Sequence, residues 1–80
     1  MTHFIFHTDP GHGWLAVPIS LLTVVGVEDR ISPYSYRDSD TAYLEEDRDA
    51  GVFLSRYTRD GGTVVTREVY MDESFVRLLP

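Results

Sequence analysis

The chain has 80 residues, a formal net charge of −6 and no cysteine, with 42% hydrophobic and 25% charged residues. This length holds a single domain, residues 1–80, and the ordinary globular mix excludes a disordered tail. The lack of cysteine excludes disulfides, iron–sulfur clusters and thiolate zinc sites, and no apolar run approaches the roughly 20 residues of a membrane span. The first residues carry no basic run, so we expect no secretory signal, no membrane contact and a cytoplasmic location.

The negative charge is concentrated in the middle of the chain. Residues 28–49 contain eight carboxylates against three arginines, whereas the segments on either side are close to neutral. Such a field repels the backbone of nucleic acids and attracts basic surfaces. We therefore expect a basic protein surface, and not nucleic acid itself, as the partner.

The first part of the chain predicts a hairpin followed by a helix. Side chains alternate in character over residues 3–8, turn formers fill residues 9–13, and residues 14–17 are typical of a second strand. Apolar residues then recur at helical spacing over residues 18–25, and Gly26 supplies a C-terminal stop. The β-branched residues in this helix have poor propensity, so tertiary packing must hold it.

The second part of the chain repeats this arrangement. Residues 31–37 and 41–45 predict another hairpin, and the apolar spacing over residues 48–59 predicts another helix. Residues 63–70 are rich in β-branched side chains and predict a strand, and residues 74–79 are the candidate for a last short strand. The order ββ-α-ββ-α-β(β) predicts an α+β fold, with a small antiparallel sheet of four to six strands and two short helices on one face.

Histidines and a glycine-rich turn give one candidate site. His3 and His7 would lie about 13 Å apart on an extended strand, which is too far for both to bind one zinc ion. Asp9, His12 and Trp14 are close together in the sequence and define a candidate ligand-sensing or metal-sensing site. Exposed turn histidines and a buried tryptophan are the simpler interpretation of the same residues.

Signatures of catalysis are missing from the sequence. The segment Asp38-Ser39-Asp40 begins like a calcium loop, but Tyr43 stands where that loop requires glycine. No G-x-S-x-G elbow and no thiol is present to act as a nucleophile. We therefore expect a protein that is not an enzyme and that uses no metal or cofactor.

Carboxylates interleaved with tyrosines give the second candidate site. Alternate residues of a hairpin share a face, so these side chains would form an exposed acidic face suited to an arginine-rich groove. A solvated face that keeps the domain soluble is one alternative, and stabilisation of the N-terminus of the helix over residues 48–59 is another. The candidate partner-binding residues are Asp38, Asp40, Glu45, Glu46, Asp47, Asp49, Tyr36 and Tyr43.

The sequence contains the strings HTDPGHGWL at 7–15, ISPYSY at 31–36, YLEED at 43–47 and DAG at 49–51. Over residues 3–57, these strings resemble a family of small uncharacterised proteins encoded by phages, prophages and plasmids. The family pattern has a Gln-Arg-Gly-type turn where this chain has residues 37–40, and often a cysteine where this chain has Arg48. The first difference adds acid to the turn and the second removes a thiol.

This resemblance implies a source in mobile elements and, with the acidic charge, an anti-CRISPR-like inhibitor. Such a protein would act in the cytoplasm of the bacterial host, where it would cover the DNA-binding surface of a defence complex, with a CRISPR surveillance complex as the first candidate. The alternatives are an accessory domain that senses a small ligand or metal through Asp9, His12 and Trp14, and a self-associating structural module. A monomer or a weak homodimer is expected.

Overall fold

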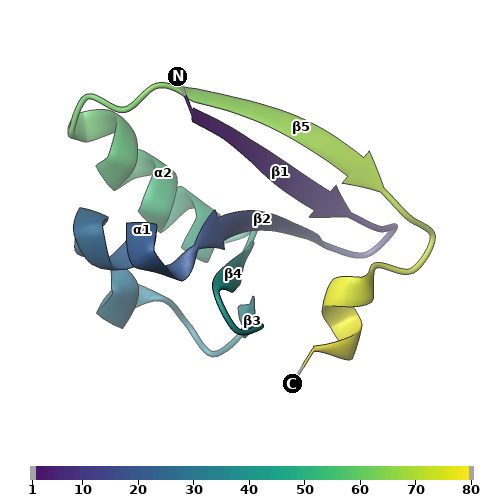
Figure 1. Cartoon of the computed structure of the whole chain (residues 1–80). Helices are drawn as coiled ribbons and strands as arrows, with labels where there is room; N and C mark the ends of the chain where they lie inside the picture. The colour runs from purple at the N-terminus through teal and green to yellow at the C-terminus, as the bar shows by residue number, and fades with distance from the viewer. Residues whose placement is uncertain (1, 80) are drawn as a thin grey trace.

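Residues 2–79 are described by the computed structural model and form a five-stranded sheet, two α-helices and two short 3-10 helices (Figure 1). The α+β class and the order of strands and helices as far as the fifth strand agree with the sequence prediction. No helix in this part of the chain is long and apolar enough to cross a membrane. The elements are β1 (Thr2–Thr8), β2 (Gly13–Pro18), α1 (Ile19–Val25), η1 (Glu28–Arg30), β3 (Tyr36–Arg37), β4 (Thr41–Glu45), α2 (Asp49–Arg59), β5 (Val64–Tyr70) and η2 (Phe75–Leu78).

The sheet has the strand order β3-β4-β2-β1-β5 and is mixed. The pairs β1–β2, β2–β4 and β3–β4 are antiparallel, but β1 and β5 are parallel, with His3 opposite Val65 and His7 opposite Val69. The prediction of a wholly antiparallel sheet is corrected at this one pairing. A parallel neighbour needs a long crossover, which the chain from β2 to α2 supplies. β5 is consequently an edge strand that pairs on one side only within the described residues.

Both helices pack on one face of the sheet and form the main core with it (Figure 1). The alternation of the strands points Leu15 and Leu44 to this face, where they meet Leu22 of α1 and Phe53 of α2, all at most 1% exposed. α1 ends as predicted at Gly26, whose φ of 84° lies in the left-handed region and whose N–H donates to the Leu22 carbonyl at 2.9 Å. Burial of these side chains explains why a helix rich in β-branched residues persists.

The opposite face of the sheet carries a smaller cluster that the C-terminal segment covers. Trp14 and Tyr43 contact Val76 of η2, and these three residues are at most 7% exposed. The prediction of a strand over residues 74–79 is therefore wrong. Ser74 starts a 3-10 turn instead, because its hydroxyl accepts a hydrogen bond from the Val76 N–H at 3.3 Å, and the turn places Val76 on the sheet.

The segment before β4 also differs from the prediction, because only Tyr36 and Arg37 form a strand there. The hydroxyls of Ser32 and Ser35 both donate to the Asp49 carboxylate. These bonds hold residues 32–35 in a turn against the start of α2, where an extended strand was expected. A long-range acceptor has outweighed the local strand preference.

Candidate functional site

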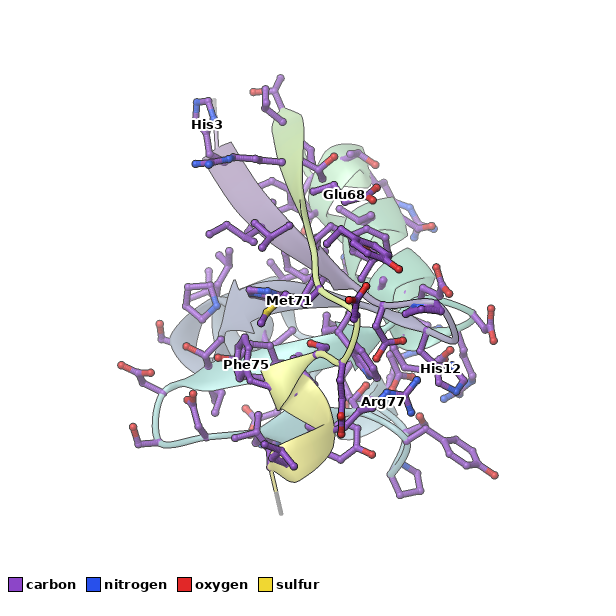
Figure 2. The ribbon with its side chains drawn as sticks, turned by 90° about the vertical axis from the view of Figure 1, so that its right-hand side faces the viewer. His3, His12, Glu68, Met71, Phe75 and Arg77 are labelled. Carbon is purple, nitrogen blue, oxygen red and sulfur yellow. The ribbon has the colours of Figure 1, made fainter. Side chains whose placement is uncertain are left out.

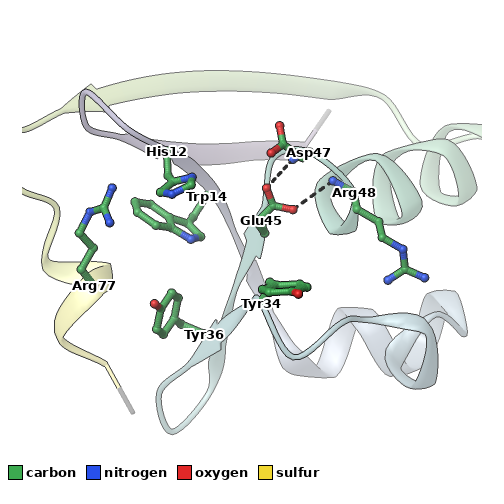
Figure 3. A pocket seen from close by; sticks show the side chains of 8 residues that line it. All are labelled: His12, Trp14, Tyr34, Tyr36, Glu45, Asp47, Arg48 and Arg77. Atoms are coloured by element: carbon green, nitrogen blue, oxygen red, sulfur yellow. Dashed lines mark hydrogen bonds between the residues drawn. The ribbon is translucent and has the colours of Figure 1, made fainter.

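A pocket of about 440 Å³ lies where the first turn, the β3–β4 hairpin and η2 meet, on the side of the sheet away from the main core (Figure 3). This volume falls within the range of small-ligand pockets. Three aromatic side chains, one imidazole, two carboxylates and two guanidinium groups surround it. We call it the aromatic pocket, and its lining residues are His12, Trp14, Tyr34, Tyr36, Glu45, Asp47, Arg48 and Arg77.

Trp14 forms the base of the aromatic pocket and is only 2% exposed. The ring of Tyr36 meets the indole edge-on at 6.2 Å between centroids, and the ring of His12 lies at 5.9 Å. The guanidinium of Arg77 lies 5.3 Å from the centre of the indole ring. Figure 2 shows Arg77 extending from η2 toward the turn that carries His12. The Trp14 indole therefore forms a cation–π contact with the guanidinium of Arg77.

Asp9 holds the Arg77 side chain in place at this side of the aromatic pocket. Its carboxylate accepts hydrogen bonds from Arg77 Nε and, at 2.9 Å, from Arg77 Nη2. The N–H groups of Gly11 and His12 donate to it at 3.0 Å each, and that of Ser74 donates at 3.3 Å. The Arg77 guanidinium, with these N–H donors, holds the pKa of Asp9 well below its usual range despite burial.

Only two of the three residues of the candidate site at Asp9, His12 and Trp14 line the aromatic pocket. His12 and Trp14 line the aromatic pocket, but the buried Asp9 carboxylate is occupied by Arg77 and by backbone donors. No group of three His, Cys, Asp or Glu side chains within residues 2–79 lies close enough together to hold a metal ion. His7 packs between the rings of Tyr43 and Phe75, at 5.8 and 5.0 Å, and burial lowers its pKa.

Asp49 was predicted on the exposed acidic face, and this placement is wrong because the residue is fully buried. Its carboxylate accepts from the Ser32 N–H at 3.0 Å, from the Ser32 hydroxyl at 2.6 Å and from the Ser35 hydroxyl. Arg48 Nη1 lies 3.3 Å away at the surface. Burial alone would raise the pKa of Asp49, but the hydrogen bonds from Ser32 and Ser35 and the charge of Arg48 outweigh it, so the pKa lies below its usual value.

Tyr43 was predicted as an exposed anchor, and this placement is also wrong because only 7% of the residue is exposed. Its ring packs edge-on against Phe75 at 5.5 Å, and its hydroxyl donates to Asp38 Oδ2 at 3.1 Å. Burial and the Asp38 carboxylate raise the pKa of Tyr43. Asp38 itself is exposed and also accepts from the Asp40 and Thr41 N–H groups, so it closes the hairpin turn.

The remaining predicted residues fall into two groups. Tyr36, Glu45 and Asp47 line the aromatic pocket, where Glu45 accepts from the Asp47 N–H at 2.8 Å and the Arg48 N–H at 3.2 Å (Figure 3). Asp38, Asp40 and Glu46 lie outside it and are exposed. The carboxylates therefore lie at both ends of β4, about 14 Å apart by strand rise, and do not form the single row that was expected.

Three residues of the aromatic pocket, Tyr34, Arg48 and Arg77, were not among the sequence candidates. Tyr34 is 76% exposed and stands at the rim, on the turn that Ser32 and Ser35 tie to Asp49. The repeated serines around it were the available signal, because such hydroxyls often bond a nearby carboxylate. Arg77 had no local signal, since its partner Asp9 is 68 residues away in the sequence.

Known proteins give no guide to the function. No protein-family model matches the sequence, and neither a curated protein nor a solved structure matches it. The resemblance to a family of phage, prophage and plasmid proteins therefore stays an expectation from the sequence. The function has to be argued from the aromatic pocket and from the exposed carboxylates.

Proposed function

We propose that the chain is a non-enzymatic inhibitor, encoded by a phage or another mobile element, that binds a basic nucleic-acid-binding surface of a host defence complex. The first candidate for that partner is a CRISPR surveillance complex in the bacterial cytoplasm. The inhibitor would act as a mimic of nucleic acid charge and compete with DNA for the same surface. The competition is steric and electrostatic, so it needs no catalytic group.

One observation carries this proposal: Asp38, Asp40, Glu46 and Asp47 are exposed, and none forms an ion pair with another described residue. Asp38 also closes the hairpin turn, and Glu46 and Asp47 precede the first turn of α2, but neither role pairs these carboxylates with a cation. Four uncompensated carboxylates around β4 therefore leave a local field that attracts a basic surface. Four further carboxylates are also exposed and form no ion pair with another described residue: Asp29, Glu68, Asp72 and Glu73. These are divided between η1, β5 and the segment after β5, as a role in solubility alone would allow.

The test is a DNA-binding assay with a purified CRISPR surveillance complex and its target DNA. Wild-type protein is expected to raise the DNA concentration needed for half-saturation of the complex. The variant Asp38→Asn, Asp40→Asn, Glu46→Gln and Asp47→Asn should lose at least about tenfold in inhibitory potency, since each rim charge contributes modestly. The inhibition should also weaken as salt rises through the physiological range, because exposed charges are screened.

A matched control carries the same change of charge at other exposed carboxylates that form no ion pair with a described residue: Asp29→Asn, Glu68→Gln, Asp72→Asn and Glu73→Gln. All four of these residues are exposed. If the control loses as much potency as the β4 variant, the effect is one of net charge and the proposed face is wrong. Inhibition by neither the wild type nor the control, with folding verified by circular dichroism, would reject this class of partner.

A further inference from the structure

The aromatic pocket already holds one guanidinium group, and the way it is held defines the chemistry of the site. Arg77 lies over the Trp14 indole at 5.3 Å and is paired with the Asp9 carboxylate. An aromatic face and a carboxylate together are a favourable environment for a planar cation. One end of the aromatic pocket therefore demonstrates what this combination of side chains can bind.

The other end of the aromatic pocket repeats this combination. Tyr34 supplies an aromatic ring there, and Glu45 and Asp47 supply carboxylates, whereas Tyr36 lies beside Trp14 (Figure 3). Neither carboxylate forms an ion pair with another residue in the part of the chain that the structure describes. The oxygens of Glu45 accept only two backbone N–H groups, so its negative charge stays uncompensated.

Arg48 does not neutralise this end. Its Nη1 atom lies 3.3 Å from Asp49 Oδ1 and donates to the Arg30 carbonyl at 3.5 Å. In Figure 3 its guanidinium extends away from Trp14 and Tyr36. With Arg77 paired to Asp9 and Arg48 beside Asp49, two negative charges remain at the aromatic pocket, those of Glu45 and Asp47.

We propose that this end of the aromatic pocket, lined by Tyr34, Glu45 and Asp47, binds an arginine side chain presented by the basic surface of the partner. The inference rests on the proposed function and names the contact that would anchor it. The two carboxylates exclude anions, and the flat ring of Tyr34 favours a planar guanidinium over a compact ammonium. Tyrosine and arginine are the residues most often found as anchors of interfaces.

The rim of the aromatic pocket is organised before any partner binds. Tyr34 is 76% exposed, yet its turn is held by the three hydrogen bonds that Ser32 and Ser35 donate to the buried Asp49. The N–H of Tyr34 also donates to the Ser32 hydroxyl at 3.3 Å. A large aromatic side chain on a fixed backbone loses little conformational freedom on binding, which favours affinity.

The test is an NMR titration of the free protein with three short peptides, acetyl-Gly-X-Gly-amide, in which X is arginine, lysine or citrulline. Trp14 is the sole tryptophan of the chain, so its indole N–H gives one assignable signal at the base of the aromatic pocket. The arginine peptide should shift this signal saturably, with a dissociation constant on the order of 1 mM. Lysine should bind about threefold more weakly, and neutral citrulline should bind at least about tenfold more weakly.

Matched variants locate the contact. Glu45→Gln and Tyr34→Ala should each weaken binding of the arginine peptide by about fivefold. Glu68→Gln and Tyr70→Ala remove the same groups from exposed positions on β5 and should change nothing. An equal response to citrulline would show that the charge of the peptide plays no part. An unchanged affinity in Glu45→Gln and Tyr34→Ala would show that the peptide binds elsewhere. Either result overturns the inference.

The titration uses no partner, so the two proposals fail separately. Inhibition of DNA binding without any arginine response would reject the aromatic pocket as the anchor and leave the proposed function in place. An arginine response without inhibition would reject the surveillance complex as the partner and retain the arginine site. A stronger response to a short single-stranded oligonucleotide than to the arginine peptide would overturn the choice of ligand.

Discussion

Asp9 and Asp49 are both buried carboxylates that hold an irregular segment against the sheet, but they do so with different donors. Asp9 is paired with a guanidinium that comes from η2, 68 residues further along the chain. Asp49 is solvated mainly by the hydroxyls of Ser32 and Ser35, with Arg48 only at its surface side. The first arrangement compensates charge with charge, and the second compensates it with dipoles. Both position residues of the aromatic pocket, Arg77 in one case and Tyr34 in the other.

The two carboxylates stabilise different parts of the molecule. The Asp9 pair ties η2 to the face of the sheet opposite the main core, so its loss would free η2 without disturbing that core. The Asp49 network lies at the first residue of α2, which packs on the main core through Phe53. We therefore expect Asp49 to control global stability and Asp9 to control the local cover over Trp14.

The largest expected effect comes from Asp49→Ala. This change removes the acceptor of three hydrogen bonds and leaves the Ser32 and Ser35 donors unsatisfied, which should cost about 2–4 kcal/mol of unfolding free energy. Urea denaturation followed by circular dichroism measures it. Asp47→Ala, two positions away and exposed, serves as the control and should change the free energy by less than about 0.5 kcal/mol. A cost for Asp49→Ala that is no larger than the control would contradict the assigned network.

A smaller and more local effect is expected from Asp9→Asn. Asparagine keeps one acceptor oxygen but loses the ionic pairing with Arg77, so η2 should detach more often from Trp14. The fluorescence of Trp14 should then shift to longer wavelength, and the amides of residues 75–78 should exchange faster with deuterium. Asp72→Asn, an exposed change before η2, should leave both signals unaltered. Unaltered exchange in Asp9→Asn would mean that Val76 packing alone holds η2.

Acidification distinguishes the two carboxylates by pH. Both pKa values are lowered in the folded protein, so the unfolded chain binds more protons and stability falls as the pH drops below about 4. The pKa of Asp9 is lowered further, because a guanidinium stabilises its charge, so its contribution should persist to lower pH than that of Asp49. Between pH 5 and pH 2, Asp49→Asn should therefore reduce the pH dependence of the unfolding free energy only in the upper part of the range, whereas Asp9→Asn should reduce it down to the lower end. Asp9→Asn flattening only the upper part of the range, and Asp49→Asn the lower end, would contradict the assigned difference.

The smallest expected effect comes from Arg48→Ala. The Arg48 side chain is 60% exposed, and Asp49 keeps its three serine donors without it, so the cost should be about 0.5 kcal/mol or less. Arg77→Ala is the counterpart on the other side and should reproduce the faster amide exchange of Asp9→Asn. If Arg48→Ala lowered the unfolding free energy as much as Asp49→Ala, the charge of Asp49 would also depend on an ion pair. The difference between Asp49 and Asp9 would then disappear.

Local patterns in the sequence were sufficient for much of the fold. The alternation in residues 3–8, the stop at Gly26 and the apolar spacing from Ala50 to Tyr57 are effects of neighbouring residues, and the elements that they predict are present. The parallel pairing of β1 with β5 and the 3-10 turn at Val76 depend on contacts between distant segments. No local pattern encodes such contacts, so these two features were predicted wrongly or not at all.

The candidate site shows the same division. Tyr36, Glu45 and Asp47 were selected from the sequence and line the aromatic pocket, as do His12 and Trp14 from the ligand hypothesis. Asp49 and Tyr43 were selected for their chemical type, but they are buried because each meets a partner elsewhere, serine hydroxyls for Asp49 and Phe75 for Tyr43. Burial of a polar residue depends on the tertiary partner that satisfies it, and this partner is not visible in one sequence.

The outer edge of β5 has a consequence for symmetry. Two copies related by a two-fold axis perpendicular to the sheet would join these edges antiparallel, and the register that pairs all seven residues, Val64–Tyr70, places Arg67 directly opposite its own copy. Like charges in directly opposed positions destabilise a pair of strands. A shift of the pairing register moves the two arginines out of direct opposition, but it also leaves residues at the strand ends without hydrogen bonds to the other copy. The central arginine thus disfavours growth of the sheet by self-addition, and it does so at the strand where such growth would begin.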